Sequence, residues 1–284
     1  MDALTTAEPK CQVTQEEKGV LFKALHEAAQ GFVMPNPWDI GSAVILKKQG
    51  YRALGSTSAG FAFSMGQPDG AVSFEQVLDH LSTLSGATDL PVSADMEDFF
   101  ADTPEQVRRN VILAAARGIV GASIQDSTGN PSAPLLSPSE AQERVYAAVE
   151  AKKSLGFDFT LTARAECFTQ PNPSLDETIK RLKLYEEAGA DVLFAPWIKT
   201  EHEVKEILAA VNRPLSVMMG FAGSQLNVNV LLGLGVKRIS TGGSLARAAY
   251  SALLAASSEI QEEGTFSYAG KSLTGKALNA LFAS

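Results

Sequence analysis

The sequence of 284 residues lacks several features typical of secreted, membrane-spanning or nucleic-acid-binding proteins. Its two cysteines, Cys11 and Cys167, are too few and too far apart for a disulfide framework. No apolar run is long enough to cross a bilayer, and the N-terminal residues MDALTTAEPKCQ lack the basic and apolar regions of a signal peptide. The formal net charge of −8 disfavours a nucleic-acid partner, which would need a basic face. We therefore expect a cytoplasmic, reduced protein.

Histidine is also scarce, and its positions disfavour two common kinds of catalytic site. The three histidines, His26, His80 and His202, fall in segments of helical periodicity rather than after predicted strands. A histidine-ligated metal or a histidine-based triad is therefore not expected. Cys167 follows a predicted strand, but no histidine is nearby in the sequence to activate its thiol. A buried, inert thiol is the favoured interpretation.

One pattern repeats along the chain: a short apolar run ends in polar or glycine residues, and a segment of helical periodicity follows. The predicted strands are 31–34, 51–56, 90–95, 119–125, 159–164, 190–195, 214–219 and 236–241. The predicted helices are 40–50, 73–86, 104–117, 138–155, 174–188, 201–212, 223–233 and 243–263. Helix-start signals such as Thr103-Pro104-Glu105 and Ser137-Pro138 support these helices. Gly118 and Gly235 stand where helices should end.

Eight strand–helix units with continuous apolar strands predict an α/β fold, a parallel TIM-type (β/α)8 barrel. A doubly wound open sheet is the alternative. No linker or low-complexity segment interrupts the pattern, so residues 1–284 are expected to form a single domain. Residues 1–16 are expected to be a loose arm or a short helix, and 264–284 a further helical tail.

Acidic residues gather at the ends of the predicted strands, where the active site of such a barrel lies. Asp95, Glu97, Asp126 and Glu166 follow the third, fourth and fifth strands, beside Arg164. Because side chains alternate along an extended chain, Asp95 and Glu97 are expected on the same side. Carboxylate ligands of this kind suit Mg²⁺. The alternative is that these acids only cap the following helix or pair with Arg164.

A glycine-containing turn, Thr241-Gly242-Gly243-Ser244, opens the last predicted helix. Such a turn can hold a phosphate, as barrels often do after their seventh and eighth strands. Glycine also simply makes tight turns. The sequence leaves both interpretations open.

Four motifs, each weak alone, are specific together. They are GSTSAGFAFSMGQPD (55–69), PVSADMED (91–98), GASIQDSTG (121–129) and LTARAE (161–166). In this order the chain resembles the isocitrate lyase/phosphoenolpyruvate mutase superfamily over roughly residues 20–265. Members of that superfamily bind 2-oxo or 2-hydroxy carboxylates on Mg²⁺ and make or break a C–C or P–C bond beside an enolate. The resemblance therefore implies a barrel with a Mg²⁺ site.

The resemblance also implies roles for individual residues. Asp95 matches the direct metal ligand, and Glu97 matches an acid that acts through water. Gln125 falls where the family has a metal-site glutamate, and Arg164 matches the arginine that contacts the enolate or carboxylate oxygen. The loop expected to grip the substrate carboxylate is Ser56, Thr57 and Ser58, and Asp69 is an expected catalytic acid behind it. After the first predicted strand, Asn36 and Trp38 are expected to contact the substrate.

Three departures from the family pattern bear on activity. Gln125 is neutral where a charged group is expected, which should weaken Mg²⁺ binding. The loop DSTGNPSAPLLSP after the fourth strand has no KKCGH or KRCGH element, so the cysteine acid of isocitrate and methylisocitrate lyases and the loop lysine of the mutases are missing. The usual DGYG segment is here Asp98-Phe99-Phe100-Ala101, which should place two aromatic rings near the mouth, over the pocket or against a neighbouring subunit.

The expected function is that of a Mg²⁺-dependent lyase that cleaves a C–C bond of a small 2-oxo or 2-hydroxy carboxylate through a metal-stabilised enolate. Decarboxylation, hydrolysis and retro-aldol cleavage all fit. The alternatives are P–C bond chemistry on phosphonopyruvate or phosphoenolpyruvate, and a member that binds carboxylates with altered or lost catalysis. The resemblance also implies a homo-oligomer, a dimer or tetramer, with the C-terminal helix exchanged between barrels. The apolar segment 245–256 suits that exchange and would equally suit the barrel's own outer ring.

Overall fold

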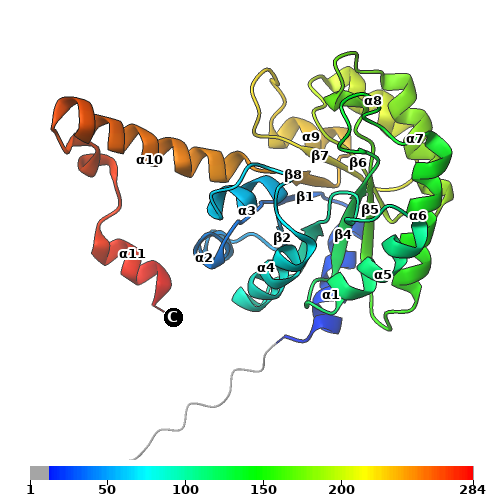
Figure 1. The fold of residues 1–284 in the computed structure, drawn as a ribbon, viewed down its shortest axis with the longest axis horizontal. Coiled ribbons are helices and arrows are strands. Elements are labelled where there is room, and N and C mark those ends of the chain that lie inside the picture. The colour runs from blue at the N-terminus through cyan, green and yellow to red at the C-terminus, as the bar shows by residue number, and fades with distance from the viewer. Residues whose placement is uncertain (1–12, 284) are drawn as a thin grey trace, which may run out of the picture.

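The computed structural model describes residues 13–283, and its centre is one parallel eight-stranded sheet. The strand order is β1-β8-β7-β6-β5-β4-β3-β2, so each strand lies beside its sequence neighbours (Figure 1). The strands are β1 (Phe32–Met34), β2 (Leu54–Gly55), β3 (Val92–Asp95), β4 (Gly121–Gln125), β5 (Thr160–Arg164), β6 (Val192–Ala195), β7 (Leu215–Met218) and β8 (Arg238–Ser240). All eight lie inside the predicted ranges.

The sheet closes into a barrel because β1 pairs with β8 and meets β2 at the remaining seam. In-register parallel pairing joins Phe32 to Arg238 and Met34 to Ser240. At the seam the Gly55 amide donates to the Pro35 carbonyl at 3.0 Å, and the Asn36 side chain donates to the Ser56 carbonyl at 2.7 Å. The TIM-type barrel is therefore confirmed, and the open doubly wound sheet is excluded.

Helices alternate with the strands and cover the outside of the sheet. They are α1 (Gln15–Glu27), α2 (Ile40–Lys48), α3 (Ser58–Ser64), α4 (Phe74–Ala87), α5 (Pro104–Ala115), α6 (Pro138–Lys153), α7 (Leu175–Glu187), α8 (Glu201–Ala210), α9 (Val228–Leu234), α10 (Ser244–Glu263) and α11 (Gly275–Phe282), with the short 3₁₀ segments η1 (Cys167–Thr169) and η2 (Ser267–Lys271). Side-chain caps begin most of them, as predicted at Thr103 and Ser137, and Ser174 caps α7 in the same way. No described helix is long and apolar enough to span a membrane.

Three helices differ from the sequence prediction. Helix α1 begins at Gln15 and is capped by Thr14, so the last residues of the predicted arm 1–16 already belong to a helix. Residues 1–12, which include Cys11, lie outside the described part of the chain. Helix α3 follows β2 directly, where only a loop was expected. Helix α9 begins at residue 228 rather than 223, because Asn227 provides the N-cap and Gly223 has a positive φ of 88°.

Helix α1 covers the N-terminal end of the barrel. Phe22 is fully buried and packs edge-on against His26 and Phe32, with ring centroids 4.7 and 6.3 Å away. The interior above this plug is unusually polar, because small hydroxyl side chains replace the branched apolar residues that usually fill such a barrel. The buried interior hydroxyls are those of Ser93, Ser123, Thr162, Ser216 and Ser240. They leave room inside the barrel for a cavity.

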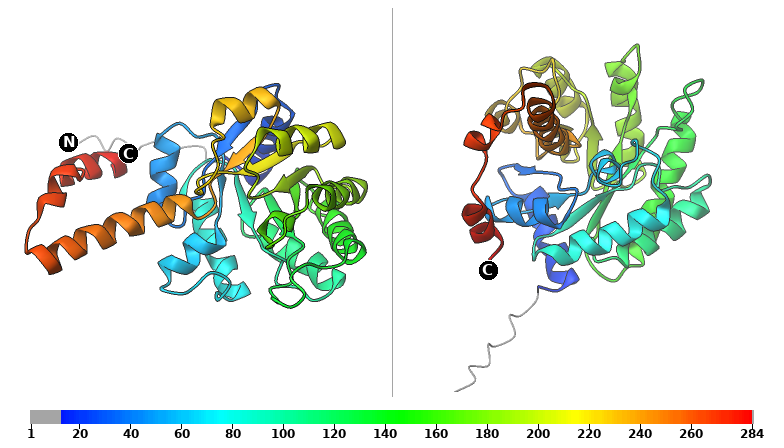
Figure 2. Two further views of the ribbon diagram at one scale, coloured as in Figure 1. Left: turned by 90° about the horizontal axis from the view of Figure 1, so that it is seen from above. Right: turned by 60° about the vertical axis from the view of Figure 1, so that its left-hand side comes forward.

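The C-terminal segment leaves the barrel. Helix α10 starts at the barrel rim and runs outward, with Ala246 as its one buried residue, so it does not complete the outer ring (Figures 1 and 2). After Gly264 the chain turns back, and α11 reaches α2. Large apolar side chains stay exposed along α10 and the segment that connects it to α11. They include Leu253 at 63%, Leu254 at 66%, Phe266 at 64% and Leu273 at 62%.

Candidate active site

A cavity of about 430 Å³ opens at the carboxyl ends of the strands and reaches into the barrel. It collects side chains from every strand-to-helix connection, as expected for this fold. The predicted site residues that line it are Asn36, Ser56, Thr57, Ser58, Asp69, Asp95, Glu97, Gln125 and Arg164. Trp38 lies outside the lining; its amide donates to Ser42 Oγ at 3.1 Å, at the entrance to α2.

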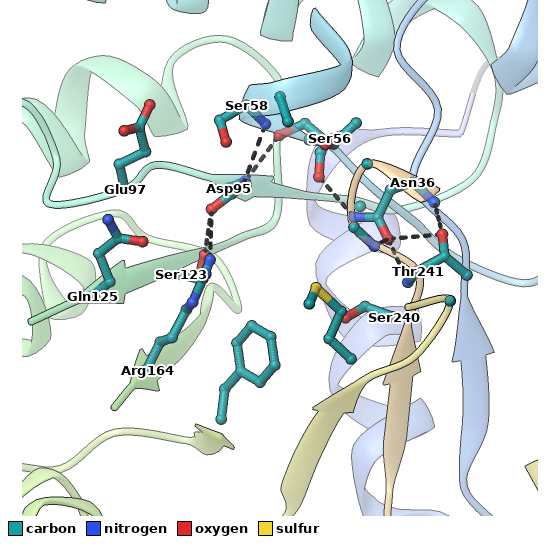
Figure 3. Close-up of a pocket in the computed structure, with 18 of the residues that line it drawn as sticks. Asn36, Ser56, Ser58, Asp95, Glu97, Ser123, Gln125, Arg164, Ser240 and Thr241 are labelled. Atoms are coloured by element: carbon teal, nitrogen blue, oxygen red, sulfur yellow. Dashed lines mark hydrogen bonds and ion pairs between the residues drawn. The ribbon is translucent and has the colours of Figure 1, made fainter. Parts of the chain in front are cut away.

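Asp95, the last residue of β3, stands at the centre of the polar contacts. Its Oδ2 accepts from the Ser58 amide at 3.3 Å, and its Oδ1 accepts from Ser123 Oγ at 3.4 Å (Figure 3). The Asp95 amide in turn donates to Ser56 Oγ at 2.8 Å. Because these contacts come from the end of β2 and from β4, the two neighbours of β3, the carboxylate is fixed in orientation while its side chain remains 21% exposed to the cavity.

Arg164, the last residue of β5, faces Asp95 across the cavity. Its Nη1 lies 3.5 Å from Asp95 Oδ1, and its guanidinium lies 5.2 Å from the centre of the Phe194 ring. Its Nε also contacts the buried carboxylate of Glu166. Burial of the Arg164 side chain disfavours its charged form, but the nearby carboxylates of Glu166 and Asp95 favour it and raise the pKa of Arg164 above its usual value. The guanidinium is therefore a permanent, positioned cation.

Glu166 is held by a buried network that the sequence did not reveal. Its amide donates to Asp126 Oδ1 at 2.8 Å. Asp126 Oδ2 accepts from Tyr185 Oη at 2.6 Å and from Arg181 Nη1 at 2.9 Å. Arg181 and Tyr185 are four residues apart on α7, but nothing in their local sequence distinguishes them from surface residues. These hydrogen bonds connect α7 and the end of β4 to the segment directly after Arg164.

Glu97 lies beyond the end of β3 in a left-handed conformation, with φ at 51°. This turn brings its side chain to the same cavity as Asp95, as predicted. The backbone carbonyl of Glu97 accepts a hydrogen bond from the backbone amide of Gln125 at 2.9 Å. The two side chains lie close together in the cavity (Figure 3). Burial, with further repulsion from Asp95, Asp69 and Asp98, raises the pKa of Glu97 to about 7. A bound cation would relieve this repulsion.

The donor set fits Mg²⁺ better than a metal that needs a protein cage. Within residues 13–283, no group of three or more His, Cys, Asp or Glu side chains has the arrangement of a metal site. The available donors are the carboxylates of Asp95 and Glu97 and the side-chain amide of Gln125. Mg²⁺ typically takes one or two carboxylates and completes its octahedron with water and substrate oxygens. These residues could hold the ion in that way.

The floor of the cavity carries a second arginine, which no motif in the sequence indicated. Arg238 is 2% exposed and spans the barrel interior from β8. Its Nε donates to Ser216 Oγ at 2.9 Å and its Nη2 to Thr162 Oγ1 at 3.0 Å, while Nη1 lies 3.4 Å from His26 Nε2. Burial lowers the pKa of Arg238 to about 9, and no carboxylate among the described residues compensates its charge.

Phe99, which was expected at the mouth together with Phe100, does not lie there. Phe99 is fully buried in the core, and Phe100 packs on Phe74 with ring centroids 5.5 Å apart. Phe99 and Phe100 have positive φ values of 62° and 50°, and Asn110 Nδ2 donates to the Phe99 carbonyl at 2.8 Å. This tight turn directs Phe99 inward. The prediction of two rings at the mouth is therefore wrong for Phe99.

The remaining candidates from the sequence play no direct part in the cavity. Cys167 is a buried free thiol outside the lining, and burial raises its pKa to about 11, which keeps it protonated. Phe61 stacks on His80 with the rings 3.9 Å apart. His202 is exposed on α8. By contrast, the turn at Gly242 and Gly243 does line the cavity.

Comparisons with known proteins agree with this geometry. The chain matches the phosphoenolpyruvate phosphomutase family over residues 22–261. A crystal structure of a protein assigned as a lyase/mutase from Burkholderia cenocepacia J2315 is 45% identical, with a TM-score of 0.93, and covers 95% of this chain and 98% of that one. The 2-methylisocitrate lyase of Escherichia coli K12 is 29% identical over 61% of this chain and 60% of its own length.

A phosphonopyruvate hydrolase solved with oxalate and Mg²⁺ has the same fold, with a TM-score of 0.82 at 22% identity over 93% of this chain and 94% of the hydrolase. The family match spans most of the barrel, and the relatives with named activities include lyases such as the 2-methylisocitrate lyase. The chain therefore belongs to the phosphoenolpyruvate phosphomutase family and is an enzyme of the isocitrate lyase/phosphoenolpyruvate mutase superfamily.

Proposed function

We propose that the protein is a Mg²⁺-dependent lyase that cleaves a C–C bond of a small 2-oxo or 2-hydroxy carboxylate by way of an enolate. The observation that carries this proposal is the position of Asp95 at the centre of the cavity. It is fixed by the Ser58 amide and Ser123, faces Arg164 and stands beside Glu97 and Gln125. Carboxylates and a cation converge on one small space where an anionic substrate can bind.

The charges of the site residues indicate a separate role for each of them. Bound Mg²⁺ supplies positive charge beside a developing oxyanion. Asp95 would hold the ion, and the side chains of Glu97 and Gln125 would help to hold it from the same side of the cavity. Arg164 donates to the substrate oxygen that gains charge as the bond breaks, which stabilises the transition state more than the ground state. Its contact with Glu166 holds the guanidinium in place beforehand.

The polar side of the cavity holds the substrate carboxylate. Ser56, Thr57 and Ser58 bring hydroxyl and amide groups to the start of α3, and Asn36 joins β1 to the turn at Thr241 through a 2.8 Å hydrogen bond to the Thr241 amide. Asp69 lies at the exposed rim, where a carboxyl group can exchange protons with solvent. We assign it the proton transfer that accompanies cleavage.

P–C bond cleavage of a phosphonate-bearing oxo acid is the second candidate. The loop 127–137 carries no cation, but Arg247 from α10 lines the rim and donates to the Gly220 carbonyl at 3.0 Å. A phosphonate could use this guanidinium. Release of inorganic phosphate from phosphonopyruvate would favour this reaction over C–C cleavage.

We further propose a homo-oligomer in which α10 packs on a neighbouring barrel. Exposed Leu253 and Leu254 lie on a helix that leaves its own barrel, and such a surface is costly in water. The double substitution Leu253→Glu with Leu254→Glu should lower the mass measured by light scattering to that of a monomer. An unchanged mass would contradict the proposal.

The proposed reaction is tested by following products from a panel of 2-oxo and 2-hydroxy acids by NMR. Wild-type protein with Mg²⁺ should release a pyruvate-type or oxalate-type product from at least one of them. Asp95→Ala should abolish turnover, since it removes the proposed metal ligand. Turnover that persists in this variant, or survives chelation of Mg²⁺, would contradict the metal assignment.

A further inference from the structure

The two sides of the cavity differ in chemistry. The carboxylates, with Ser56, Ser58 and Ser123, come from the β2–β5 side. The β6–β7 side contributes no charged side chain to the lining. It presents instead a surface, here called the apolar wall, that consists of Phe194, Trp197, Met218, Met219 and Phe221.

The apolar wall is ordered by packing inside the barrel and at its rim. Phe194 is 7% exposed and lies directly beside the Arg164 guanidinium. Trp197 and Phe221, from the loops after β6 and β7, pack together with ring centroids 4.7 Å apart. Trp197 has a positive φ of 65°, a conformation uncommon for a bulky residue. The wall thus extends from Arg164 outward to the rim.

A substrate held by its carboxylate and oxo oxygens near Asp95 and Arg164 must place the rest of its carbon chain somewhere in this cavity. The β2–β5 side already holds several carboxylates, which would repel a second negative charge. Against the apolar wall, a second carboxylate would lose its hydration without gaining a partner, whereas an alkyl or aryl group would gain from burial.

Two further arginines line the cavity, and neither lies in the wall. Arg238 is on the floor, where Ser216, Thr162 and His26 already surround it. Arg247 is exposed at the rim and donates to the Gly220 carbonyl. A second carboxylate could reach a cation only by leaving the wall.

We propose that the substrate is a monocarboxylic 2-oxo acid whose C4 carries a hydroxyl or oxo group and an apolar arm, branched aliphatic or aromatic, that packs on the apolar wall. Breaking the C3–C4 bond then leaves the pyruvate-type enolate, which takes up a proton, and releases the arm as an aldehyde or, with water, as a carboxylic acid. This inference rests on the proposed function, because it takes the Asp95–Arg164 site as the place where the oxo acid is held. It distinguishes substrates by the group at the end opposite the carboxylate that binds near Asp95 and Arg164. A cavity of about 430 Å³ accommodates an acid of this size.

A matched ligand pair tests the wall directly. 2-Hydroxy-4-methylpentanoate and malate have the same number and branching of heavy atoms, and differ in carrying an isopropyl group or a carboxylate at the far end. Calorimetric titration of the wild-type protein with Mg²⁺ should give a dissociation constant at least tenfold lower for the methylpentanoate. Oxalate, which has no arm, serves as the reference ligand for the metal and arginine site.

A substitution in the wall should change this preference. Met218→Gln keeps the length of the side chain and adds an amide that can pair with a carboxylate, so the preference should fall at least threefold. Met65→Gln makes the same chemical change at a position that is 48% exposed and outside the lining, and should leave the preference unchanged. Oxalate should bind all three proteins alike.

The outcomes separate the two proposals. If oxalate binds and malate is preferred or binds equally well, the apolar arm is refuted while the proposed function stands, and Arg238 or Arg247 receives the second carboxylate. If oxalate fails to bind folded protein with Mg²⁺, the proposed function fails and this inference fails with it. An unchanged preference in Met218→Gln would also overturn the role of the wall.

Discussion

Replacing the buried Arg238 by methionine should make the protein more stable and weaken its binding of carboxylates. The guanidinium lies between the floor of the cavity and the plug formed by α1, and no described carboxylate neutralises it. Methionine has a similar length and no charge. It removes the cost of burying the cation together with the hydrogen bonds that the cation makes.

The magnitude follows from two opposing terms. Burial lowers the pKa of Arg238 from 12.5 to about 9, and a shift of one unit corresponds to about 1.4 kcal/mol, so the buried charge costs about 5 kcal/mol. The two hydrogen bonds to Ser216 and Thr162 would be lost, at about 1.5 kcal/mol each because the donor is charged, and the 3.4 Å contact with His26 is too long to add much. The difference predicts a gain of about 2 kcal/mol, in line with other buried charges replaced by apolar side chains.

The carboxylate affinity should change in the opposite direction. A cation on the order of 10 Å from a bound anion contributes about 1–2 kcal/mol at an effective dielectric constant of about 20, so oxalate binding should weaken roughly tenfold. Urea denaturation and calorimetric oxalate titration at pH 7.5 measure the two quantities. Arg213→Met, on the exposed loop before β7, is the matched control and should change neither. A loss of more than about 2 kcal/mol in Arg238→Met would show that Arg238 is chiefly a structural tie for α1 and refute this reasoning.

Gln125→Glu should tighten Mg²⁺ binding roughly tenfold above pH 8 by adding a carboxylate beside Asp95, as titration with a competing chelator would measure; weaker binding would place the ion elsewhere. Burial lowers the pKa of His80 to about 4, so between that value and its usual 6.5 the unfolded state binds more protons and stability falls as the pH falls. From pH 7 to 5 this group alone costs about 2 kcal/mol, and His26, whose pKa burial lowers to about 3, adds a similar loss. His80→Phe should therefore remove about 2 kcal/mol of the pH dependence in urea titrations at the two pH values, and an unchanged pH dependence would contradict this reasoning. Phe99→Ala should cost about 3–5 kcal/mol in the same assay, because the ring is fully buried; a cost below 1 kcal/mol would place it at the mouth after all.

The barrel could be predicted because its signals are local. Continuous apolar strands, cap residues such as Thr103 and terminal glycines such as Gly235 specify each unit on their own, and every observed strand falls within its predicted range. Asp95 and Arg164 could be found for a related reason: each ends a strand, and the fold brings strand ends together.

The parts that were missed depend on contacts between distant segments. Nothing near Arg238 in the sequence shows that β8 would direct it into a barrel lined with hydroxyl groups. The support of Glu166 by Tyr185 comes through Asp126, across residues far apart in the chain. Phe99 looked like a mouth residue because the backbone turn that directs it inward requires positive φ values at residues where none is expected.

The central claim is that Asp95 and Arg164 form a site for Mg²⁺ and an enolate-like dianion. Thermal unfolding with oxalate and Mg²⁺ tests it most directly. A ligand at a hundredfold its dissociation constant stabilises the folded state by about 2.7 kcal/mol, which should raise the midpoint by about 5 °C in a chain of this size. We predict this shift only when oxalate and Mg²⁺ are both present, and its loss in Asp95→Ala. No shift in well-folded wild-type protein, or an equal shift after chelation of the metal, would contradict the account.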